Sequence, residues 1–305
     1  MRFANLKQET RNKKLFKLFK PETRNSSNPS TERSELSEAK PETLLKHMYE
    51  KHFKGPRKQP ENLIYGIHPI LEALHAGKDI EKIMLSRELR NVQVREITTL
   101  AEKLEIPVQK VPNEKLDSFT KSNHQGIVAF VSMIEYQPIE DILIRSFEAG
   151  RQPIFIVLDR ITDVRNMGAI ARSAECAGVE AIIVPSRGSA QINADAIKTS
   201  AGALNLIPVH RSPNLKNTLR YLRDSGVKLI AVTEHGSTEY TSTDLTGPVA
   251  FIMGSEDEGI SPEYLKLCDD KIKISLTGTI NSLNVSVAAG VIIFETIRQR
   301  NLASV

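Results

Sequence analysis

The feature that most constrains the fold is a regular alternation of short apolar segments with amphipathic ones in the second half of the chain. Each apolar segment has the length and the Ile/Val content of a strand, and the stretches between them are long enough for helices. This alternation is typical of a parallel sheet covered by helices on both faces, an α/β fold. The predicted strands are IFIVL (154–158), AIIV (181–184), LIPV (206–209), KLIAV (228–232), VAFIM (249–253) and KIKI (271–274).

The predicted helices between these strands span 166–177, 193–200, 213–225 and 261–268, and a last helix spans 283–300. A smaller α/β unit precedes them at 62–135. It contains the helical pattern HPILEALHAG, the strand-like IEKIMLS, an amphipathic stretch over 92–104, and the strands IPVQKV and GIVAFVS. Residues 136–152 are expected to form a helical linker, so that the larger domain spans 153–302.

Charge is distributed unevenly along the chain. Residues 1–60 hold 15 of the 41 Lys and Arg residues and 7 of the 37 Asp and Glu residues, which leaves 26 basic and 30 acidic residues for the rest. The tail is also rich in Ser, Asn and Pro, so we expect it to be disordered. A basic tail on a slightly acidic body either attracts nucleic-acid phosphates or is a silent extension, and the sequence favours neither.

Composition excludes several classes of protein. The two cysteines, Cys176 and Cys268, cannot form a disulfide framework or a four-ligand zinc site, and we expect both to be buried. The histidines are scattered, so no metal is expected. No apolar run approaches the roughly 18 residues of a membrane span, and the N-terminus lacks the pattern of a secretion signal, so we expect a cytoplasmic protein.

Ligands of parallel α/β sheets bind at the carboxyl ends of the strands. The glycine fingerprints of dinucleotide-binding and P-loop proteins are missing there. After 154–158 comes LDRITDVRNMGAIARSAECAG, in which Asn166 is expected to cap a helix. Small residues, Gly168 among them, would let another backbone approach that helix, and Arg172 is a lone cation among them that suits a phosphate or carboxylate.

The other two loops are also polar. FIMGSEDEGIS brings Gly254 and then Glu256 and two further acids to the end of a strand. Three acids would repel a phosphate, so this loop suits ribose hydroxyls, an ammonium group or a catalytic role. KISLTGTINSLNVSVAAG crowds Asn281, Ser282 and Asn284 at a strand–helix junction, where helix capping explains only one of the first two.

These three loops together resemble the signature motifs of the SpoU/TrmH (SPOUT) family of RNA 2'-O-methyltransferases. The matching segments are N-x-G-A-I-x-R-S-A, G-S-E-x-E-G and S-L-N-V-S-V-A-A. IYGIHPILEAL and HQGIVAFVS are similar to the start and end of the small RNA-binding domain, like ribosomal protein L30e, that many members carry. The resemblance covers about 62–302 and is closest to bacterial 23S rRNA (guanosine-2'-O-)methyltransferases of the RlmB kind.

The resemblance implies a C-terminal trefoil knot, a homodimer, and S-adenosylmethionine held in the knot by backbone near Gly254, Ile274 and Leu283. The polar active-site positions that it implies are Asn166, Arg172, Glu256, Ser282 and Asn284. Family members are proposed to use the arginine as the base. Because arginine normally stays charged, we expect Arg172 to contact the RNA phosphate or the nascent alkoxide, and the proton acceptor stays open between Arg172 and Glu256.

Two other functions remain open at this point. One is a tRNA 2'-O-methyltransferase, and the other is a catalytically silent RNA-binding or ribosome-assembly protein on the same fold. The small unit at 62–135 favours rRNA over tRNA by analogy, and the complete polar set favours an enzyme.

Overall fold

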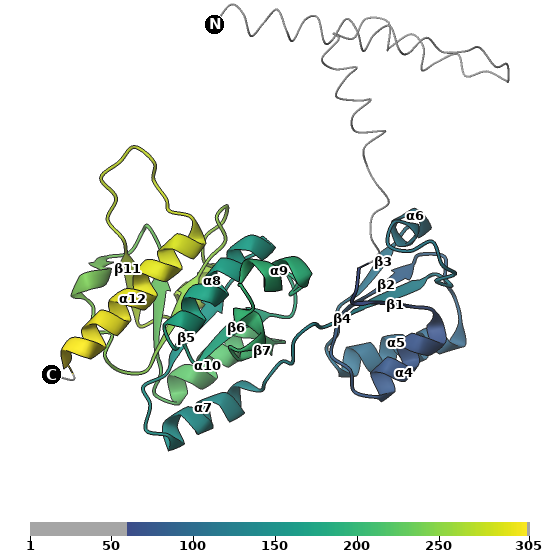
Figure 1. Cartoon of the computed structure of the whole chain (residues 1–305), viewed down its shortest axis with the longest axis horizontal. Coiled ribbons are helices and arrows are strands. Elements are labelled where there is room, and N and C mark those ends of the chain that lie inside the picture. Colours follow the sequence, from purple (N-terminus) through teal and green to yellow (C-terminus); the bar gives the residue numbers. More distant parts are fainter. Residues whose placement is uncertain (1–59, 304–305) are drawn as a thin grey trace, which may run out of the picture. The chain divides into compact units, whose positions relative to one another are not determined.

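The computed structural model describes residues 60–303. The basic tail, with the disorder expected for it, lies outside the described residues. Figure 1 shows the chain with its elements labelled. Among residues 60–303 no helix is long and apolar enough to cross a membrane.

The smaller unit is built on a four-stranded sheet with the order β1-β4-β2-β3. Strand β4 runs antiparallel to β1 and β2, whereas β3 is parallel to β2. Helices α4 and α5 bury Ile70 and Ile97 against one face of the sheet, and α6 buries Leu116 against the other. The elements are β1 (Leu63–Tyr65), α4 (Ile67–His75), β2 (Ile80–Ser86), α5 (Val92–Lys103), β3 (Val108–Val111), α6 (Asn113–Asp117) and β4 (Ile127–Val131).

The larger unit is a seven-stranded sheet with the order β7-β6-β5-β10-β8-β11-β9, in which every pairing is parallel. It follows α7 (Ile139–Glu148), the helix expected within 136–152. The strands are β5 (Ile154–Leu158), β6 (Ala181–Pro185), β7 (Val209–Ser212), β8 (Lys228–Val232), β9 (Thr238–Glu239), β10 (Val249–Met253) and β11 (Asp270–Lys273). The helices are α8 (Val164–Cys176), α9 (Ala194–Thr199), α10 (Leu215–Asp224), α11 (Pro262–Leu265) and α12 (Val285–Ala303), with 3₁₀ turns η1 (Ala203–Asn205) and η2 (Tyr240–Ser242).

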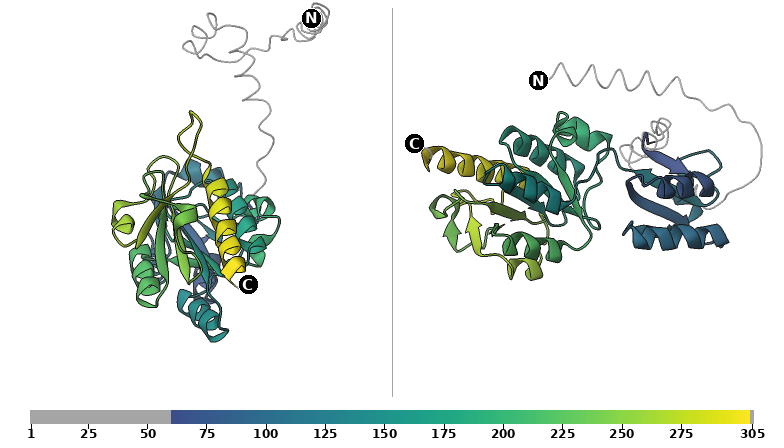
Figure 2. Two further views of the ribbon diagram at one scale, coloured as in Figure 1. Left: turned by 90° about the vertical axis from the view of Figure 1, so that its left-hand side faces the viewer. Right: turned by 90° about the horizontal axis from the view of Figure 1, so that it is seen from below.

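Alternate residues of β5 face two separate hydrophobic cores. Ile156 packs with α8 and α12 on one face, and Phe155 packs with α7 and α10 on the other. Figure 2 shows these helix pairs on opposite faces of the sheet. Because a strand's side chains alternate between faces, IFIVL is apolar throughout and both faces of β5 are buried. The predicted doubly covered parallel sheet is therefore confirmed.

The direction of strand addition reverses at the centre of this sheet. From β5 the chain adds β6 and β7 on one side, and then crosses to β8 and β10 on the other. Strands β5 and β10 are neighbours in register from Ile154↔Val249 to Leu158↔Met253. Their carboxyl ends define the switch point at which such sheets bind ligands.

Three local expectations were wrong. The apolar run 206–209 is not a strand: Leu206 is exposed, and the ladder with β6 begins only at Val209. Helix α11 ends at Leu265, three residues before the expected end. Cys176 is exposed, because it faces solvent at the end of α8. Cys268 is half-buried, and burial raises the pKa of its thiol to about 12.

The close approach expected at Gly168 is confirmed. A Cβ at this position would lie 2.7 Å from the Cβ of Thr199 and 2.8 Å from the carbonyl oxygen of Ala196, so α8 and α9 touch here through backbone. Glycine is therefore required by space, although alanine is the better helix former.

We predict that Gly168→Ala lowers the free energy of unfolding by about 1–3 kcal/mol, because the steric overlap outweighs the gain in helix propensity. Urea denaturation measures the change. Gly247→Ala is the control, because a Cβ at Gly247 has nothing within 4 Å. A Gly168→Ala protein as stable as the wild type would show that α9 shifts to accommodate the added methyl group without loss of stability.

Candidate active site

The loop after β5 is held by an aspartate. Asp163 caps α8 by accepting a hydrogen bond from the backbone N–H of Arg165 at 2.8 Å, so the helix begins at Val164. The expectation that Asn166 caps this helix was therefore wrong. Asn166 lies in the first turn, and its side-chain amide is available for contacts outside the helix.

Three polar side chains from the three loops form one hydrogen-bonded network. The amide nitrogen of Asn166 donates to Oε1 of Glu256 at 3.1 Å. The amide nitrogen of Asn284 donates to the same oxygen at 2.9 Å and to Oδ1 of Asn166 at 3.0 Å. Two amides thus orient one carboxylate, whose second oxygen makes no hydrogen bond among the described residues.

Asn284 also begins the last helix. Its Oδ1 accepts hydrogen bonds from the backbone N–H and the hydroxyl of Ser286, and α12 starts at Val285. Neither Asn281 nor Ser282 caps the helix, in contrast to the expectation for one of them. The same side chain therefore fixes the helix terminus with its oxygen and the Glu256 carboxylate with its nitrogen.

A cavity of about 380 Å³ lies beside the network at the carboxyl edge of the sheet. Gly254, Ile274 and Leu283 line it, as do Glu256 and Ser282. The remaining lining residues include apolar side chains from β8, β10 and α12 and the acids of the loop after β10. Within residues 60–303 no group of three His, Cys, Asp or Glu side chains could hold a metal ion.

Glycine is required in the wall of this cavity. A Cβ at Gly254 would lie 2.1 Å from the carbonyl carbon of Gly259 and 2.3 Å from the nitrogen of Ile260. The loop therefore folds back on its own backbone, and the bridge between Ser255 and Gly259 closes it. Because glycine has no side chain, a ligand in this cavity can approach the backbone groups of the tight turn closely.

Two residues of this region were missed by the sequence analysis. Asp159 is almost fully buried and accepts a hydrogen bond from the backbone N–H of Ser261 at 2.6 Å. Arg160 has a φ of 60°, bonds to Asp159 and Glu258, and donates to the carbonyl oxygen of Gly259 at 3.1 Å. Together they tie the end of β5 to the acidic loop. A charged pair directly after a buried strand is the sequence signal that could have indicated them.

Arg172 is not part of the network in this chain. It is exposed, and it makes no hydrogen bond or ion pair to any residue between 60 and 303. Arg172 lies six positions after Asn166 on α8, so their side chains point about 240° apart around the helix. The structure thus brings together Asn166, Glu256 and Asn284, and places Ser282 on the adjoining cavity.

Comparison with known proteins agrees with this geometry. The SpoU rRNA Methylase family model matches residues 153–294, and the model for RNA 2'-O ribose methyltransferase substrate binding matches 63–137. A protein of Staphylococcus saprophyticus assigned to the TrmH family of tRNA/rRNA methyltransferases is 35% identical over 241 residues, which cover 79% of this chain and 97% of the relative. Its Bacillus subtilis counterpart YacO is 32% identical, over 80% of this chain and 98% of its own.

The chain belongs to the SpoU/TrmH family of RNA methyltransferases.

Solved SpoU/TrmH structures share the fold. The SpoU methyltransferase AviRb of Streptomyces viridochromogenes, solved in complex with AdoMet, is 26% identical, covers 84% of this chain and 98% of its own, and has a TM-score of 0.51. An AdoMet-bound rRNA methyltransferase of Sinorhizobium meliloti is 25% identical, covers 83% of this chain and 90% of its own, and has a TM-score of 0.50.

The contacts of Arg160 predict how variants of this SpoU/TrmH protein behave. Arg160→Ala removes the side-chain bonds and keeps the left-handed φ, whereas Arg160→Gly removes the same bonds and relieves the backbone strain. We expect Arg160→Ala to be the less stable of the two by about 1 kcal/mol. Both variants should speed hydrogen exchange at the amide of Gly259, because the bonds that hold its loop to β5 are lost.

Urea denaturation and hydrogen exchange measure these two effects separately. Equal stability of the two variants would show that no strain is stored at position 160. Unchanged exchange at Gly259 would show that Arg160 does not order the acidic loop.

Proposed function

We propose that this chain transfers a methyl group from S-adenosylmethionine to a ribose 2'-hydroxyl of RNA, with a guanosine of 23S rRNA as the substrate. The observation that carries the proposal is the Asn166–Glu256–Asn284 network beside the cavity at the switch point. It stands in a chain of the SpoU/TrmH family, whose AdoMet-bound members share the fold.

The chemistry of the cavity fits this cofactor. Ile274, Leu283 and Val285 offer an apolar surface for adenine, and Asp257 offers an acceptor for a ribose hydroxyl or an ammonium group. The tight turn at Gly254 offers backbone groups at close range. The volume of about 380 Å³ is within the usual range of small-ligand sites.

When bound, S-adenosylmethionine supplies a methyl group activated by a positively charged sulfur. The protein must then hold the ribose in line with that methyl and accept the proton of the 2'-hydroxyl. Glu256 is the group that we propose for the proton, because two amides fix one carboxylate oxygen and leave the other without a partner. Asn166 and Asn284 position that carboxylate, and Ser282 orients the ribose from the cavity wall.

Arg172 has a separate role in this proposal. It is an exposed cation that does not reach the network in its own chain, so we assign it to the RNA phosphate or the developing alkoxide rather than to proton removal. A homodimer could bring the arginine of a second copy to the site. The exposed Val287, Phe294 and Leu302 on α12 support such an interface.

A knot at the C-terminal end is part of the same proposal. The segment after β8 runs against β11, where Thr233 and Ser237 donate backbone hydrogen bonds to Ile272 and Lys271. A Cβ at Gly236 would lie 2.4 Å from the carbonyl carbon of Ile272, so the two backbones touch. Strand β11 lies between β8 and β9 in the sheet, so the segment that joins these two strands passes around the end of β11, as threading would require.

We predict that the full chain moves a labelled methyl from S-adenosylmethionine to rRNA isolated from a strain that lacks the gene. The product should be a 2'-O-methylguanosine in 23S rRNA, located by resistance of the adjacent phosphodiester to alkali. Label found in tRNA instead would support a tRNA methyltransferase. Cofactor binding without methylation of any RNA would support a silent RNA-binding protein.

The two candidates for the proton acceptor predict different variant behaviour. Glu256→Gln should lower single-turnover methylation by about 10²-fold or more at saturating RNA, because the amide cannot accept the proton. Arg172→Ala should mainly weaken RNA binding or the stabilisation of the developing alkoxide, and added salt should increase the loss of RNA affinity. Arg172→Lys should recover little activity if the planar fork matters.

Matched pH–rate profiles distinguish the two roles. If Glu256 accepts the proton, the acidic limb of the wild-type profile disappears in Glu256→Gln and persists in Arg172→Ala. An unchanged profile in Glu256→Gln, with near-normal turnover, would move proton removal away from this carboxylate.

A further inference from the structure

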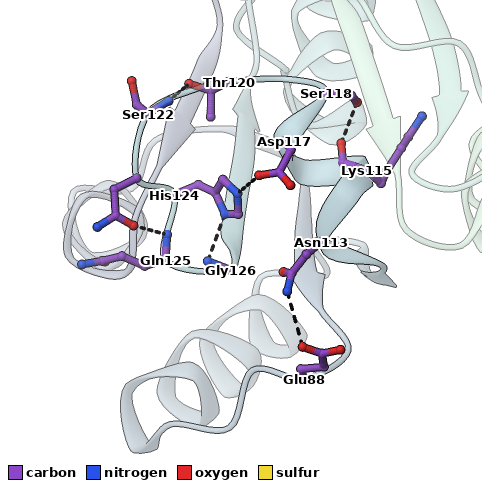
Figure 3. A network of polar contacts seen from close by, with 11 residues as sticks. Glu88, Asn113, Lys115, Asp117, Ser118, Thr120, Ser122, His124, Gln125 and Gly126 are labelled. Carbon is purple, nitrogen blue, oxygen red and sulfur yellow. Dashed lines mark hydrogen bonds and ion pairs between the residues drawn. The ribbon is translucent and has the colours of Figure 1, made fainter. Parts of the chain in front are cut away.

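A polar depression lies at one edge of the smaller sheet, outside the candidate active site. Three segments meet there because β2 and β3 are parallel and end at this edge, and antiparallel β4 begins at it. The depression has a volume of about 430 Å³. It is lined by Ser86, Glu88, Leu89, Asn113, Asp117 and the turn 123–126. Figure 3 shows the polar side chains around it.

The turn that forms one wall is rigidly held. Nδ1 of His124 accepts a hydrogen bond from the backbone N–H of Gly126 at 3.0 Å, so Nε2 carries the proton and donates to Asp117 at 2.9 Å. Gln125 and Gly126 both have a positive φ. Oε1 of Gln125 accepts a hydrogen bond from the backbone N–H of Ile67 at 3.0 Å, which anchors the turn to α4.

Two carboxylates that line the depression have no Lys or Arg partner among residues 60–303. Among residues 60–303 the Asp117 carboxylate bonds only to His124 and the Glu88 carboxylate only to the amide of Asn113, at 3.5 Å; neither pairs with Lys or Arg. Oδ1 of Asn123 is engaged by the backbone N–H of Gln125, which leaves its amide hydrogens available. A ligand that fills this depression must therefore bring donors for two carboxylates and an acceptor for an amide.

Four cations are close in sequence to the residues that line the depression. Arg87, Arg90, Lys115 and Lys121 are exposed neighbours of the lining residues and make no ion pair within the described part of the chain. Lys115 lies over the ring of Phe119 at 5.4 Å. An acceptor-lined hollow with exposed cations next to it in the sequence suits a ligand whose inserted part carries hydrogen-bond donors and whose flanking groups are phosphates.

We propose that this depression binds the Watson–Crick edge of an unpaired guanine in the RNA substrate. The proposal rests on the RNA methyltransferase function proposed above and adds a base-reading site on the smaller unit. Guanine offers N1–H and N2–H₂ side by side, which one carboxylate accepts as a pair, and O6 accepts from an amide. No other RNA base presents two adjacent donors and an acceptor on that edge.

The size of the hollow and its place on the smaller unit, which holds none of the Asn166–Glu256–Asn284 network, define its role. A single base enters such a depression, whereas the paired bases of a duplex keep this edge hidden, so the site reads loops, bulges or ends. We assign the flanking phosphates to these four exposed cations, which supply affinity that does not depend on RNA sequence. The guanine bound here is therefore a recognition nucleotide and is different from the nucleotide that receives the methyl group.

Chemical footprinting of rRNA in complex with the full chain tests this proposal. Kethoxal modifies unpaired guanines at N1 and N2, the atoms that the carboxylate would cover. We expect the wild type to protect at least one guanine besides the methylated nucleotide. Asp117→Asn and Glu88→Gln should expose it again and weaken RNA binding by about tenfold, because an amide cannot accept both donors.

Glu114→Gln is the matched control, because Glu114 is an exposed acid on the same short helix that does not line the depression. It should leave the footprint and the RNA affinity unchanged. Protection that persists in Asp117→Asn and Glu88→Gln, or protection from dimethyl sulfate at adenine or cytosine instead, would overturn the proposal. A wild type that methylates no RNA would contradict the proposed function instead, so the two failures are distinguishable.

Discussion

The site depends on one carboxylate oxygen that accepts two amide hydrogen bonds. Oε1 of Glu256, in the loop after β10, accepts hydrogen bonds from the amides of Asn166, in the first turn of α8, and Asn284, in the loop before α12. Charge-assisted bonds of this kind are roughly twice as strong as neutral ones. Segments that are remote in sequence are thereby joined at one point, and the cavity beside them acquires a fixed wall.

The sheet determines where that point lies. Reversal of strand order between β5 and β10 opens the carboxyl edge at the centre of the sheet, and the first two loops leave from these neighbouring strands. The third loop starts at β11, which is separated from β10 by β8, so it must be long to return to Glu256. In Figure 1 this loop, between β11 and α12, extends well beyond the sheet. Capping of α12 by Asn284 brings the end of the loop back to the site.

Much of this was predictable from sequence, and the failures have physical causes. Continuous apolar runs predicted β5, β8 and β10 with their observed bounds. Strands that are buried on both faces are apolar at every position, so each run begins and ends with its strand. The prediction of a strand at 206–209 was wrong because apolar content alone does not show which residues pair with the neighbouring strand. Asn166 was mistaken for a cap because Asp163 and Asn166 are both good capping residues, and only the structure shows which of them the helix uses. The bonds of Arg160 depend on a left-handed φ that no sequence pattern indicates at an arginine.

A double-mutant cycle on single-turnover methylation tests the central claim that Asn166 and Glu256 act as one unit. The rates of Asn166→Ala, Glu256→Ala and the double variant would be compared with the wild type at saturating RNA and cofactor. We expect the double variant to be hardly slower than the slower single variant, with a coupling energy of about 1–3 kcal/mol. Losses that simply add would show instead that Asn166 and Glu256 act independently.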